Sequence, residues 1–491
     1  MVKIILNGKE VEVDPKKPLI NACHHNEADV PMYCYHPGLT PVGSCRICQV
    51  EVQVGKMPAR VVVACRTPVS EGMVVNTGAP GAHEARKQCL EFLLKNHPLD
   101  CPICDKAGEC DLQDYAFNEG QGEGRSVEPR RKLEKRKSLG DVIVLDEERC
   151  ILCSRCVRFF EDITHKPQLT TSGIGARSVI STFMDRALEG NYQGNLADIC
   201  PVGALTLKQF RFQARVWNLS KHFSTCGECS RGCSVNIETL RGQAVKRIRP
   251  RYNAKVNEWW MCDTGRFSFE RFNTEGRIEG AFLRGERGFE PVPTSAALGQ
   301  LRDIFSVRPK PVLVVSPWLT IEEGALVVEL AGKLDTAARF ISPPASGLKD
   351  ELLNTGDPCP NRRGLEELGI KGAEASELLA EMKDAQSAML LGERVAELLG
   401  LDGLAETPPT CRTVLVDTHA VDAPTINVAL GAPNSAERSG TWVNIDGIHG
   451  RITTAKPAPR GVPPLTETLE MMLKVLEASS TTHPMKSEVQ A

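Results

Sequence analysis

The sequence lacks three features, and each absence excludes a class of protein. No uninterrupted apolar run approaches the roughly 18 residues that a membrane-spanning helix needs, and the longest runs, such as PVLVV from Pro311, suit buried strands. Lysine and arginine number 59 against 62 aspartates and glutamates, so the formal net charge of −3 does not favour a nucleic-acid surface. No glycine-rich dinucleotide fingerprint or P-loop stands at an expected strand-to-helix turn, so nothing marks a nucleotide site.

The length and the first residues indicate a multidomain protein. At about 150 residues per domain, the 491 residues predict three or more domains. The opening stretch MVKIILNGKEVEV consists of two alternating apolar runs around Asn7 and Gly8, which predicts a β-hairpin. This start leaves no room for a signal or transit peptide, so we expect a soluble chain in a bacterial-type cytosol that can dock onto a membrane partner.

Cysteine is abundant in the first half of the chain and scarce in the second. Of 19 cysteines, 17 lie at or before Cys262, and only Cys359 and Cys411 follow. In a large chain without a secretory signal, grouped C-x-x-C elements indicate metal or cluster sites rather than a disulfide framework. The first half is therefore expected to carry inorganic chemistry.

Local patterns predict a small β-rich unit over residues 1–78. A short helix is expected near residues 19–26, followed by a loop and by the strand-like runs QVEVQV and RVVVA, the second ending at Cys65. From residue 291 onward, strand-like runs (PVLVV, ARFIS, SAMLLG, RTVLVD) alternate with helix-like runs. That alternation predicts an α/β domain with a largely parallel sheet.

Two segments between these parts have distinct patterns. Residues 79–95 have helical periodicity, with one apolar face formed by Ala85, Cys89, Phe92 and Leu93. Cys89 is accordingly interpreted as a packed side chain rather than a ligand. The charged, glycine-containing segment 122–141 predicts an exposed connector.

The first ligand group consists of four cysteines, namely Cys34, Cys45, Cys48 and Cys65. One loop supplies three thiolates and a strand end supplies the fourth, which suits a 2Fe-2S cluster beside a small β-sheet. A structural zinc site uses the same thiolates, and the spacing leaves this alternative open.

The second group combines one histidine with three cysteines, namely His97, Cys101, Cys104 and Cys110. Three thiolates can hold three corners of a 4Fe-4S cube, and one further base must hold the last iron. Neutral imidazole can do so through one ring nitrogen. Alternatively, His97 only ends the preceding helix, because Asn96 and Pro98 beside it also favour a helix stop. The residues alone leave both roles open.

The third and fourth groups each offer four thiolates. The third is a C-x-x-C-x-x-C run with a remote Cys-Pro, a ferredoxin-type signature for 4Fe-4S ligation, and consists of Cys150, Cys153, Cys156 and Cys200. The fourth consists of Cys226, Cys229, Cys233 and Cys262. The remaining cysteines have no ligand-spaced neighbours and are interpreted as inertly buried: Cys23, Cys89, Cys359 and Cys411. One binuclear and three cubane clusters would hold about 14 irons, and four closed sites indicate a path for electrons rather than a place for bond making.

Three stretches carry a family resemblance: PMYCYHPGLTPVGSCRIC, CPICDKAGECDLQ and RCILCSRCVRF. Over about residues 1–275, the chain closely resembles the 75 kDa-type iron-sulfur subunit of respiratory complex I, the bacterial NADH-quinone oxidoreductase. One mild departure is Ala107, where the family usually has glycine or serine. The resemblance implies a 2Fe-2S cluster on the first group and 4Fe-4S clusters on the second and third, with His97 as a ligand. It relates the fourth group to an additional cubane of some members, off the main electron path.

The second half resembles the molybdopterin-oxidoreductase fold that this family carries, in shortened form. SGTWVNIDGIHGRI, from Ser439, is similar to its late GT-x-x-N-x-E/D-G element, with extra residues between Gly447 and Arg451. Pterin enzymes of that superfamily usually have a lysine in a C-x-K-G-R-F element, but CDTGRF places Thr264 there. We therefore expect no molybdopterin and no active molybdenum site.

The expected fold is multidomain α+β and α/β. Its domains would be a β-grasp 2Fe-2S ferredoxin-like domain (1–78), a helical one-His three-Cys 4Fe-4S segment with the charged connector (79–140), a 4Fe-4S ferredoxin-like domain (141–218), an additional 4Fe-4S domain (219–275) and the truncated molybdopterin-oxidoreductase-like α/β domain (276–491).

The resemblance implies an electron-transfer subunit of the peripheral arm of a respiratory NADH-quinone oxidoreductase, a translocase, with no substrate site or catalytic residue of its own. Its partners would be a flavin-containing NADH-binding subunit, the 2Fe-2S partner of that subunit, the quinone-proximal subunits and, indirectly, the membrane arm. The implied location is the cytoplasmic face of the bacterial inner membrane.

Three alternatives to this function are considered. The first is an NAD-linked formate dehydrogenase, against which Thr264 and the short second half argue. The second is the electron-transfer subunit of an NAD-reducing hydrogenase, which the long C-terminal domain disfavours. The third is a zinc-stapled scaffold, which would be colourless and would contain no acid-labile sulfide.

Overall fold

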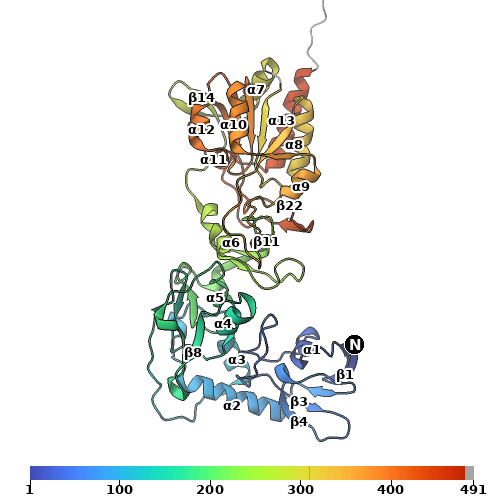
Figure 1. Ribbon diagram of the computed structural model, residues 1–491, viewed down its shortest axis with the longest axis vertical. Helices are drawn as coiled ribbons and strands as arrows, with labels where there is room; N and C mark the ends of the chain where they lie inside the picture. The colour runs from blue at the N-terminus through green and yellow to red at the C-terminus, as the bar shows by residue number, and fades with distance from the viewer. Residues whose placement is uncertain (309, 481–491) are drawn as a thin grey trace, which may run out of the picture. The chain divides into compact units, whose positions relative to one another are not determined.

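The structure is a computed structural model that describes residues 1–308 and 310–480 (Figure 1). The last part of the expected C-terminal domain, residues 481–491, lies outside the described residues. The chain divides into two compact units, Met1–Asn218 and the part from Leu219 onward, and each is described by itself.

The first unit combines short strands with short helices. Its strands are β1 Val2–Leu6, β2 Lys9–Val13, β3 Gln49–Gln53, β4 Arg60–Val63, β5 Val74–Asn76, β6 Lys137–Ser138, β7 Ile143–Leu145, β8 Leu169–Ser172, β9 Val179–Thr182 and β10 Leu205–Leu207. Its α-helices are α1 Leu19–His25, α2 Pro80–Asn96, α3 Asp111–Glu119, α4 Arg155–Arg158 and α5 Asn195–Ile199. Short turns of other helix types relevant to the site are η1 Ala64–Arg66, η2 Cys101–Ile103 and the π-helical η3 Phe159–Ile163.

The predicted hairpin at the N-terminus is confirmed. Strands β1 and β2 pair antiparallel with Leu6 opposite Lys9, and Asn7 and Gly8 between them have φ values of 50° and 83°. A tight two-residue turn needs such left-handed values, and an Asn-Gly pair adopts them readily. The hairpin joins a five-stranded sheet of order β2-β1-β5-β3-β4, whose apolar core includes the buried side of α1.

Helix α2 forms where predicted, but the predicted buried face was wrong. Phe92 is 78% exposed and Cys89 is only partly buried. The residues that the helix buries are Ala82, Arg86 and Leu90. Arg86 is the physical reason, because its guanidinium donates to the Gln49 carbonyl of β3 at 2.7 and 2.9 Å. A satisfied arginine therefore faces the sheet at a position that apolar periodicity does not mark.

The rest of the first unit consists of small sheets around loops. Residues 122–130 are almost entirely exposed, as expected for the connector. After it, β6, β7 and β10 form a three-stranded sheet of order β10-β7-β6, and β8 pairs with β9. Because the elements are short and the connections between them are long, most of the cysteines lie in loops.

The second unit begins with a three-stranded antiparallel sheet and continues into an α/β domain. Its strands are β11 Leu219–Thr225, β12 Ser234–Leu240, β13 Ala244–Pro250, β14 Ala281–Gly285, β15 Gly288–Val292, β16 Val312–Val315, β17 Ala338–Ile341, β18 Lys371–Ala373, β19 Ser387–Leu391, β20 Arg412–Asp417, β21 Ile426–Gly431, β22 Gly440–Val443 and β23 His449–Ile452. Its helices are α6 Asp263–Phe267, the 3-10 helix η7 Ser268–Asn273, α7 Thr294–Val307, α8 Ile321–Lys333, α9 Arg362–Glu367, α10 Ala375–Asp384, α11 Val395–Leu399, α12 Leu401–Glu406 and α13 Leu465–Ser480.

The predicted α/β domain with a largely parallel sheet is confirmed. Eight strands have the order β15-β14-β21-β20-β19-β16-β17-β18, and the six from β16 to β21 are parallel. Numbered along the chain, these six have the order 3-2-1-4-5-6 read from the β18 edge, which is a doubly wound arrangement. Strand order reverses between β16 and β19, and a crevice at that point is where ligands bind in such folds.

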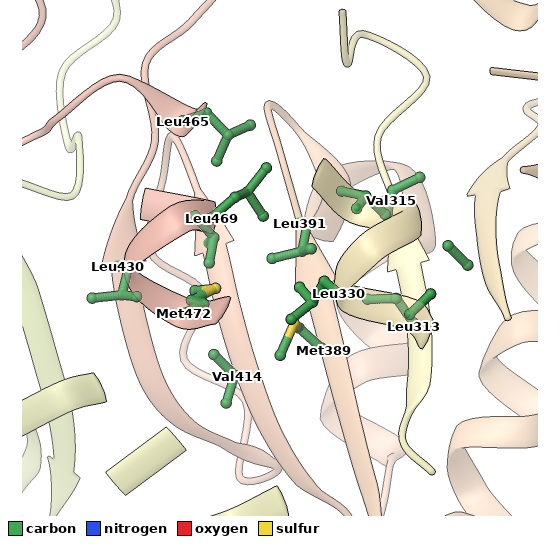
Figure 2. Close-up of a cluster of buried hydrophobic side chains, with 14 of the residues drawn as sticks. Leu313, Val315, Leu330, Met389, Leu391, Val414, Leu430, Leu465, Leu469 and Met472 are labelled. Atoms are coloured by element: carbon green, nitrogen blue, oxygen red, sulfur yellow. The ribbon is translucent and has the colours of Figure 1, made fainter. Parts of the chain in front are cut away.

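Helices cover both faces of this sheet, because alternate strand residues point to opposite sides. Leu313 and Met389 pack with α7, α8 and α13, whereas Val314 and Leu390 pack with α10, α11 and α12. Figure 2 shows the first of these cores, with Leu469 of α13 among the sheet residues. In the part of the chain that the structure describes, no helix is both long and apolar enough to cross a membrane.

Candidate metal centres

The first cysteine group lies beside the N-terminal sheet. Cys34, Cys45 and Cys48 belong to the loop between α1 and β3, and Cys65 lies in η1 directly after β4. The backbone N–H of Cys34 points at the Cys45 sulfur at 3.4 Å, and that of Cys65 at the Cys48 sulfur at 3.5 Å. Contact with the Cys45 and Cys65 thiols lowers the pKa of Cys34, which shows that these side chains converge. The structure thus brings the four predicted residues together.

Left-handed backbone occurs between the cysteines of two groups. Arg46, between Cys45 and Cys48, has φ of 59°, while Leu152 and Ser154 of the third group have φ of 53° and 58°. Such values are uncommon for residues other than glycine and concentrate at functional sites. In the third group the Leu152 N–H reaches the Cys150 sulfur at 3.4 Å, so the strained turn aims a backbone donor at a ligand atom.

The second group lies at the junction of α2 and α3. His97 follows the last residue of α2 as its C-cap, Cys101 begins η2, and Cys110 is the N-cap of α3. Cys104 and Cys110 are buried, whereas Cys101 is exposed. Burial raises the pKa of the Cys110 thiol to about 11, so a bound cation is needed to hold this side chain as a thiolate near pH 7.

His97 both ends a helix and presents a ring nitrogen without a partner. Its Nδ1 atom is buried and makes no hydrogen bond. Burial, with the Arg149 guanidinium second, lowers the pKa of His97 to about 4, so the imidazole is neutral near pH 7. A neutral imidazole with a buried, unpaired nitrogen is the form that ligates metal. Helix termination and metal ligation are therefore compatible at this residue.

A network of charged residues surrounds His97. Asp100 accepts hydrogen bonds from Lys135 at 2.6 Å and from Arg149 at 2.9 Å. Lys135 also pairs with Glu148 at 2.8 Å, and Arg149 with Asp146 at 3.3 Å. Each carboxylate near the histidine thus has a cationic partner, and the network fixes the loop after α2.

The third group surrounds a cavity. All four of its cysteines line that cavity, and the aliphatic side chains of Leu145, Ile180 and Val202 contribute to its walls. Cys153, Cys156 and Cys200 are buried, and Cys150 is partly buried. A π-helical turn follows the last cysteine of the run, a feature that is frequent at functional sites. The lining combines four thiols with mostly aliphatic side chains and the cationic Arg155, which fits an anionic cubane cluster.

The second and third groups are in direct contact. The backbone N–H of Asp111, next to Cys110, donates to the carbonyl of Pro201, next to Cys200, at 3.0 Å. A Cβ atom placed on Gly203 would lie 2.1 Å from the Cys104 sulfur, so only glycine fits there. The cysteine patterns did not predict a role for Gly203, although its position three residues after Cys200 was a usable signal.

The fourth group lies in the second unit, where β11 and β12 meet. Cys226 and Cys233 flank the turn between these strands, and the Cys226 N–H donates to the Cys233 carbonyl at 2.8 Å. Cys262 is the N-cap of α6, and its sulfur accepts from the Gly265 N–H at 3.4 Å. Burial raises the pKa of Cys226 and Cys233, and the neighbouring thiols of the group add to this effect. All four predicted cysteines are therefore buried near one another.

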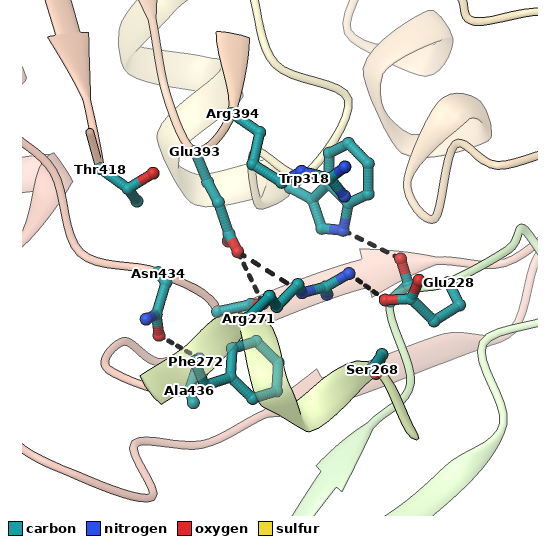
Figure 3. Close-up of polar contacts among 12 residues, drawn as sticks. Glu228, Ser268, Arg271, Phe272, Trp318, Glu393, Arg394, Thr418, Asn434 and Ala436 are labelled. Atoms are coloured by element: carbon teal, nitrogen blue, oxygen red, sulfur yellow. Dashed lines mark hydrogen bonds and ion pairs between the residues drawn. The ribbon is translucent and has the colours of Figure 1, made fainter. Parts of the chain in front are cut away.

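The loop of this fourth group contacts the point where strand order reverses. Trp318, just after β16, donates to the Gly227 carbonyl at 2.9 Å, and Arg271 is ion-paired with Glu228 (Figure 3). Arg271 also lies 4.0 Å from Glu393, which follows β19. Side chains of the protein itself thus contact one another where doubly wound folds place a ligand.

The unassigned cysteines are not grouped. Cys23, Cys359 and Cys411 are fully buried, whereas Cys89 is partly exposed, with its sulfur 3.5 Å from the Arg46 carbonyl. Within residues 1–308 and 310–480, no set of three or more His, Cys, Asp or Glu side chains is close enough together to hold a single metal ion.

Four family models match the chain. They are described as a 2Fe-2S iron-sulfur cluster binding domain (residues 1–80), the NADH-ubiquinone oxidoreductase-G iron-sulfur binding region (86–125), the NADH-quinone oxidoreductase subunit 3 ferredoxin-like domain (140–206) and the NDSU1/NuoG-like 4Fe-4S domain of NADH-ubiquinone oxidoreductase (230–270). The matches overlap all four cysteine groups and therefore indicate iron-sulfur clusters.

Curated proteins are similar over most of this chain. The 78 kDa subunit of mitochondrial NADH-ubiquinone oxidoreductase from Neurospora crassa is 42% identical over 306 residues, 62% of this chain and 40% of that protein. The G subunit of NADH-quinone oxidoreductase from Rickettsia felis is 37% identical over 331 residues, 67% of this chain and 48% of that protein. The chain is homologous to the 75 kDa-type subunits of NADH-quinone oxidoreductases.

The homology to the 75 kDa-type subunits is partial in length. The NADH-ubiquinone oxidoreductase 75 kDa subunit of Reclinomonas americana is 36% identical and covers 73% of this chain, and the match spans 52% of that protein. The chain described here thus spans about half the length of the curated relatives that it matches. Among solved structures, a chain of an NAD+-reducing [NiFe]-hydrogenase in the H2-reduced state matches 44% of this chain and 91% of that chain, with 28% identity and a TM-score of 0.39.

Proposed function

We propose that this chain is an iron-sulfur electron-transfer subunit of a respiratory NADH-quinone oxidoreductase, relaying electrons from an NADH and flavin module toward quinone. The observation that carries the proposal is the arrangement of the first unit. Three cysteine groups lie in one compact unit of residues 1–218, and hydrogen bonds between residues adjacent to their cysteines join them. Each group offers four protein ligands to iron and no vacant position for a substrate, so the arrangement suits electron transfer rather than catalysis of a bond-forming reaction.

The proposed ligand sets follow the sequence groups. Cys34, Cys45, Cys48 and Cys65 would hold a 2Fe-2S cluster; His97, Cys101, Cys104 and Cys110 would hold a 4Fe-4S cluster; Cys150, Cys153, Cys156 and Cys200 would hold another; and Cys226, Cys229, Cys233 and Cys262 would hold a third. Bound clusters of this kind supply one-electron transfer. The buried unpaired Nδ1 of His97 and the cavity lined by the third group support two of these sets directly.

The chain's own residues would hold these sites rigidly. Arg215 donates to the carbonyl of Cys104 at 2.6 Å, and the Phe212 N–H donates to Asp105 at 2.9 Å. These bonds fix the loop that carries Cys104, while Lys106 donates to the Ala197 carbonyl near the third group at 3.0 Å. An electron path requires the protein to hold its cluster ligands at fixed separations.

For the second unit, we propose a shortened molybdopterin-oxidoreductase-like domain, over residues 276–491, that binds no molybdopterin. The doubly wound strand order supports the likeness to that fold. The contacts of Trp318, Arg271 and Glu393 at the reversal of strand order support the absence of a bound cofactor there. The cubane on the fourth group would then lie off the main electron path, because no catalytic cofactor would exchange electrons with it.

The proposed partners are those of a peripheral arm. A flavin-containing NADH-binding subunit and its 2Fe-2S partner would deliver electrons, and quinone-proximal subunits would accept them. The names of the homologues support membership of such a complex. We accordingly propose a peripheral location at the cytoplasmic face of a bacterial inner membrane. The proposed domain limits are 1–78, 79–140, 141–218, 219–275 and 276–491.

Quantification of iron and acid-labile sulfide, combined with low-temperature EPR of anaerobically reduced chain, tests this proposal. We expect about 14 irons and four distinguishable clusters. A chain with zinc and no labile sulfide would contradict the proposal, and far fewer irons in fully loaded protein would reject at least one ligand set. Molybdenum in the purified chain, or formate oxidation by it, would favour a formate dehydrogenase instead.

A further inference from the structure

Two buried arginines connect the loop of the first cysteine group with that of the third. Arg155 and Arg158 form the first and last residues of α4, and each is only 5% exposed. Their spacing of three residues places both side chains on one face of the helix. No ligand set includes them, and their role beside the cysteines is not evident from the run CSRCVRF.

Arg158 donates hydrogen bonds to both loops at once. Its Nη2 atom lies 2.5 Å from the Cys34 carbonyl oxygen and 3.2 Å from that of Cys153. Its Nη1 atom lies 2.6 Å from the Thr40 carbonyl oxygen, in the first group's loop. One guanidinium therefore binds the backbone of a cysteine from each group.

Arg155 repeats this connection between neighbouring residues. Its Nη2 atom lies 2.6 Å from the carbonyl oxygen of Tyr35, next to Cys34, and its Nη1 atom lies 3.0 Å from that of Ile199, next to Cys200. Its Nε atom is buried and has no hydrogen-bond partner. Both arginines thus join the same two groups through backbone oxygens.

The charges of these arginines have no direct anionic partner among the described residues. Both guanidinium groups donate to carbonyl or hydroxyl oxygens, and among the described residues neither lies within 4 Å of a carboxylate. Asp111 interacts electrostatically with Arg155 and Asp162 with Arg158, but only at longer range. Burying a cation without a paired anion costs free energy. We therefore expect negatively charged groups, which the neighbouring side chains do not supply, at both the first and the third cysteine group.

We propose that Arg155 and Arg158, here called the arginine pair, raise the reduction potentials of the first and third clusters together and fix the separation between them. This inference rests on the ligand sets of the proposed function. A cluster held by four thiolates is anionic, and reduction adds one electron without forming or breaking a bond. A fixed positive charge beside it therefore stabilises the reduced state. Because the arginine pair borders both groups, it raises both potentials.

The test measures reduction potentials of the full chain, purified anaerobically with its clusters, by EPR at poised potentials with dithionite as reductant. We expect Arg158→Gln to shift the first-group and third-group signals to lower potential. A tenfold change in the reduction equilibrium of each corresponds to about 59 mV for a one-electron couple. Arg158→Lys keeps the charge and should restore most of the shift in both signals.

Arg66→Gln is the matched control. Arg66 adjoins Cys65 and donates to the carbonyl of Pro41, in the loop that carries Cys34 and Cys45, at 3.1 Å. Its side chain is exposed, however, and its charge is screened by water. We expect no shift from this variant. If Arg158→Gln does not assemble its clusters, Arg155→Gln provides the same measurement.

Three results would overturn the role of the arginine pair. They are unchanged potentials in Arg158→Gln with full iron content, a shift confined to one signal, and an equal shift in Arg66→Gln. Iron and sulfide content is measured first on the unsubstituted chain. Absence of the first-group or third-group signal there contradicts the ligand sets of the proposed function, whereas present but unshifted signals contradict the arginine pair alone.

Discussion

At the residue scale, one imidazole among fifteen thiols distinguishes the second group from the other three. His97 replaces a negatively charged thiolate with a neutral donor, so the ligand set carries one negative charge less. Less negative charge by itself favours the reduced state of a cluster. The Nδ1 atom of His97 is buried without a hydrogen-bond partner, and ligation of iron would satisfy it.

We predict that His97→Ala perturbs one 4Fe-4S signal and spares the other three. The expected cause is the loss of the fourth donor to one cluster, observed by EPR and by iron content. His97→Cys should give a signal with a lower reduction potential, because it adds a negatively charged thiolate to the ligand set. His25→Ala, at an exposed histidine of α1, is the control and should change nothing. An unaltered spectrum in His97→Ala would leave this residue with helix termination alone.

Gly203 permits a second prediction at the same scale. An added Cβ would meet the Cys104 sulfur at 2.1 Å, far inside normal contact. We expect Gly203→Ala to destabilise the first unit by about 1–3 kcal/mol through overpacking and to perturb the second-group signal. Chemical unfolding and EPR would measure the two effects. Gly124→Ala, where an added Cβ meets nothing within 4 Å, should be neutral; equal effects at both glycines would refute the packing argument.

At the element scale, local patterns predicted strands β16, β17, β19 and β20 of the α/β domain because each is a short apolar run, whereas β14, β15, β18 and β21 were not predicted. The same reasoning failed for α2, whose buried face contains Arg86 rather than the more apolar Phe92. That outcome depends on the distant carbonyl of Gln49, which no local pattern reveals. Helix α13 was not anticipated, although Leu465, Leu469 and Met472 have helical spacing.

The cysteine groups were predictable for the same physical reason. In each group at least two ligands stand within four residues of each other and so mark the group in the sequence, although Cys65, Cys200 and Cys262 lie farther along the chain. The side chains that connect one group to another leave no such mark, since Arg158 lies 124 residues from Cys34 along the chain. Contacts of that kind are set by the folded arrangement of two loops, and only a structure identifies them.

Helix α8 begins with a capping box that the structure shows completely. The Thr320 hydroxyl accepts from the Glu323 N–H at 3.2 Å, and the Glu323 carboxylate accepts from the Thr320 N–H at 2.8 Å. Glu323 also pairs with buried Arg438 at 3.1 Å, so the cap holds a carboxylate in place for that arginine.

Thr320→Ala should therefore lower the free energy of unfolding of the second unit by about 1–2 kcal/mol, measured with denaturant. Thr320→Ser keeps the accepting hydroxyl and should cost far less. The EPR signals of the three groups in the first unit should not change in either variant. If alanine and serine were equally destabilising, packing of the threonine methyl group rather than capping would be responsible.

At the scale of the whole molecule, the proposed ligands are unevenly divided. Twelve of the sixteen lie in Met1–Asn218, where loops rather than strands carry most of them, and four lie in the second unit. The second unit has two extensive apolar cores on the faces of its eight-stranded sheet. Because metal binding contributes directly to folding where loops provide the ligands, the two units should depend on iron to different degrees.

We predict that removal of iron by an anaerobic chelator opens the loops of the first unit and leaves the α/β domain folded. Hydrogen exchange, compared before and after removal, should show lost protection in the loops around residues 97–110 and 146–156, which have no sheet to hold them. Strands such as β19 and β20, which lie in the sheet interior and are buried apart from Arg412, should keep theirs. Cys229→Ala supplies the internal control, because it removes a ligand from the fourth group only. Loss of protection in β19 and β20 on iron removal would show instead that the clusters stabilise the chain as a single cooperative body.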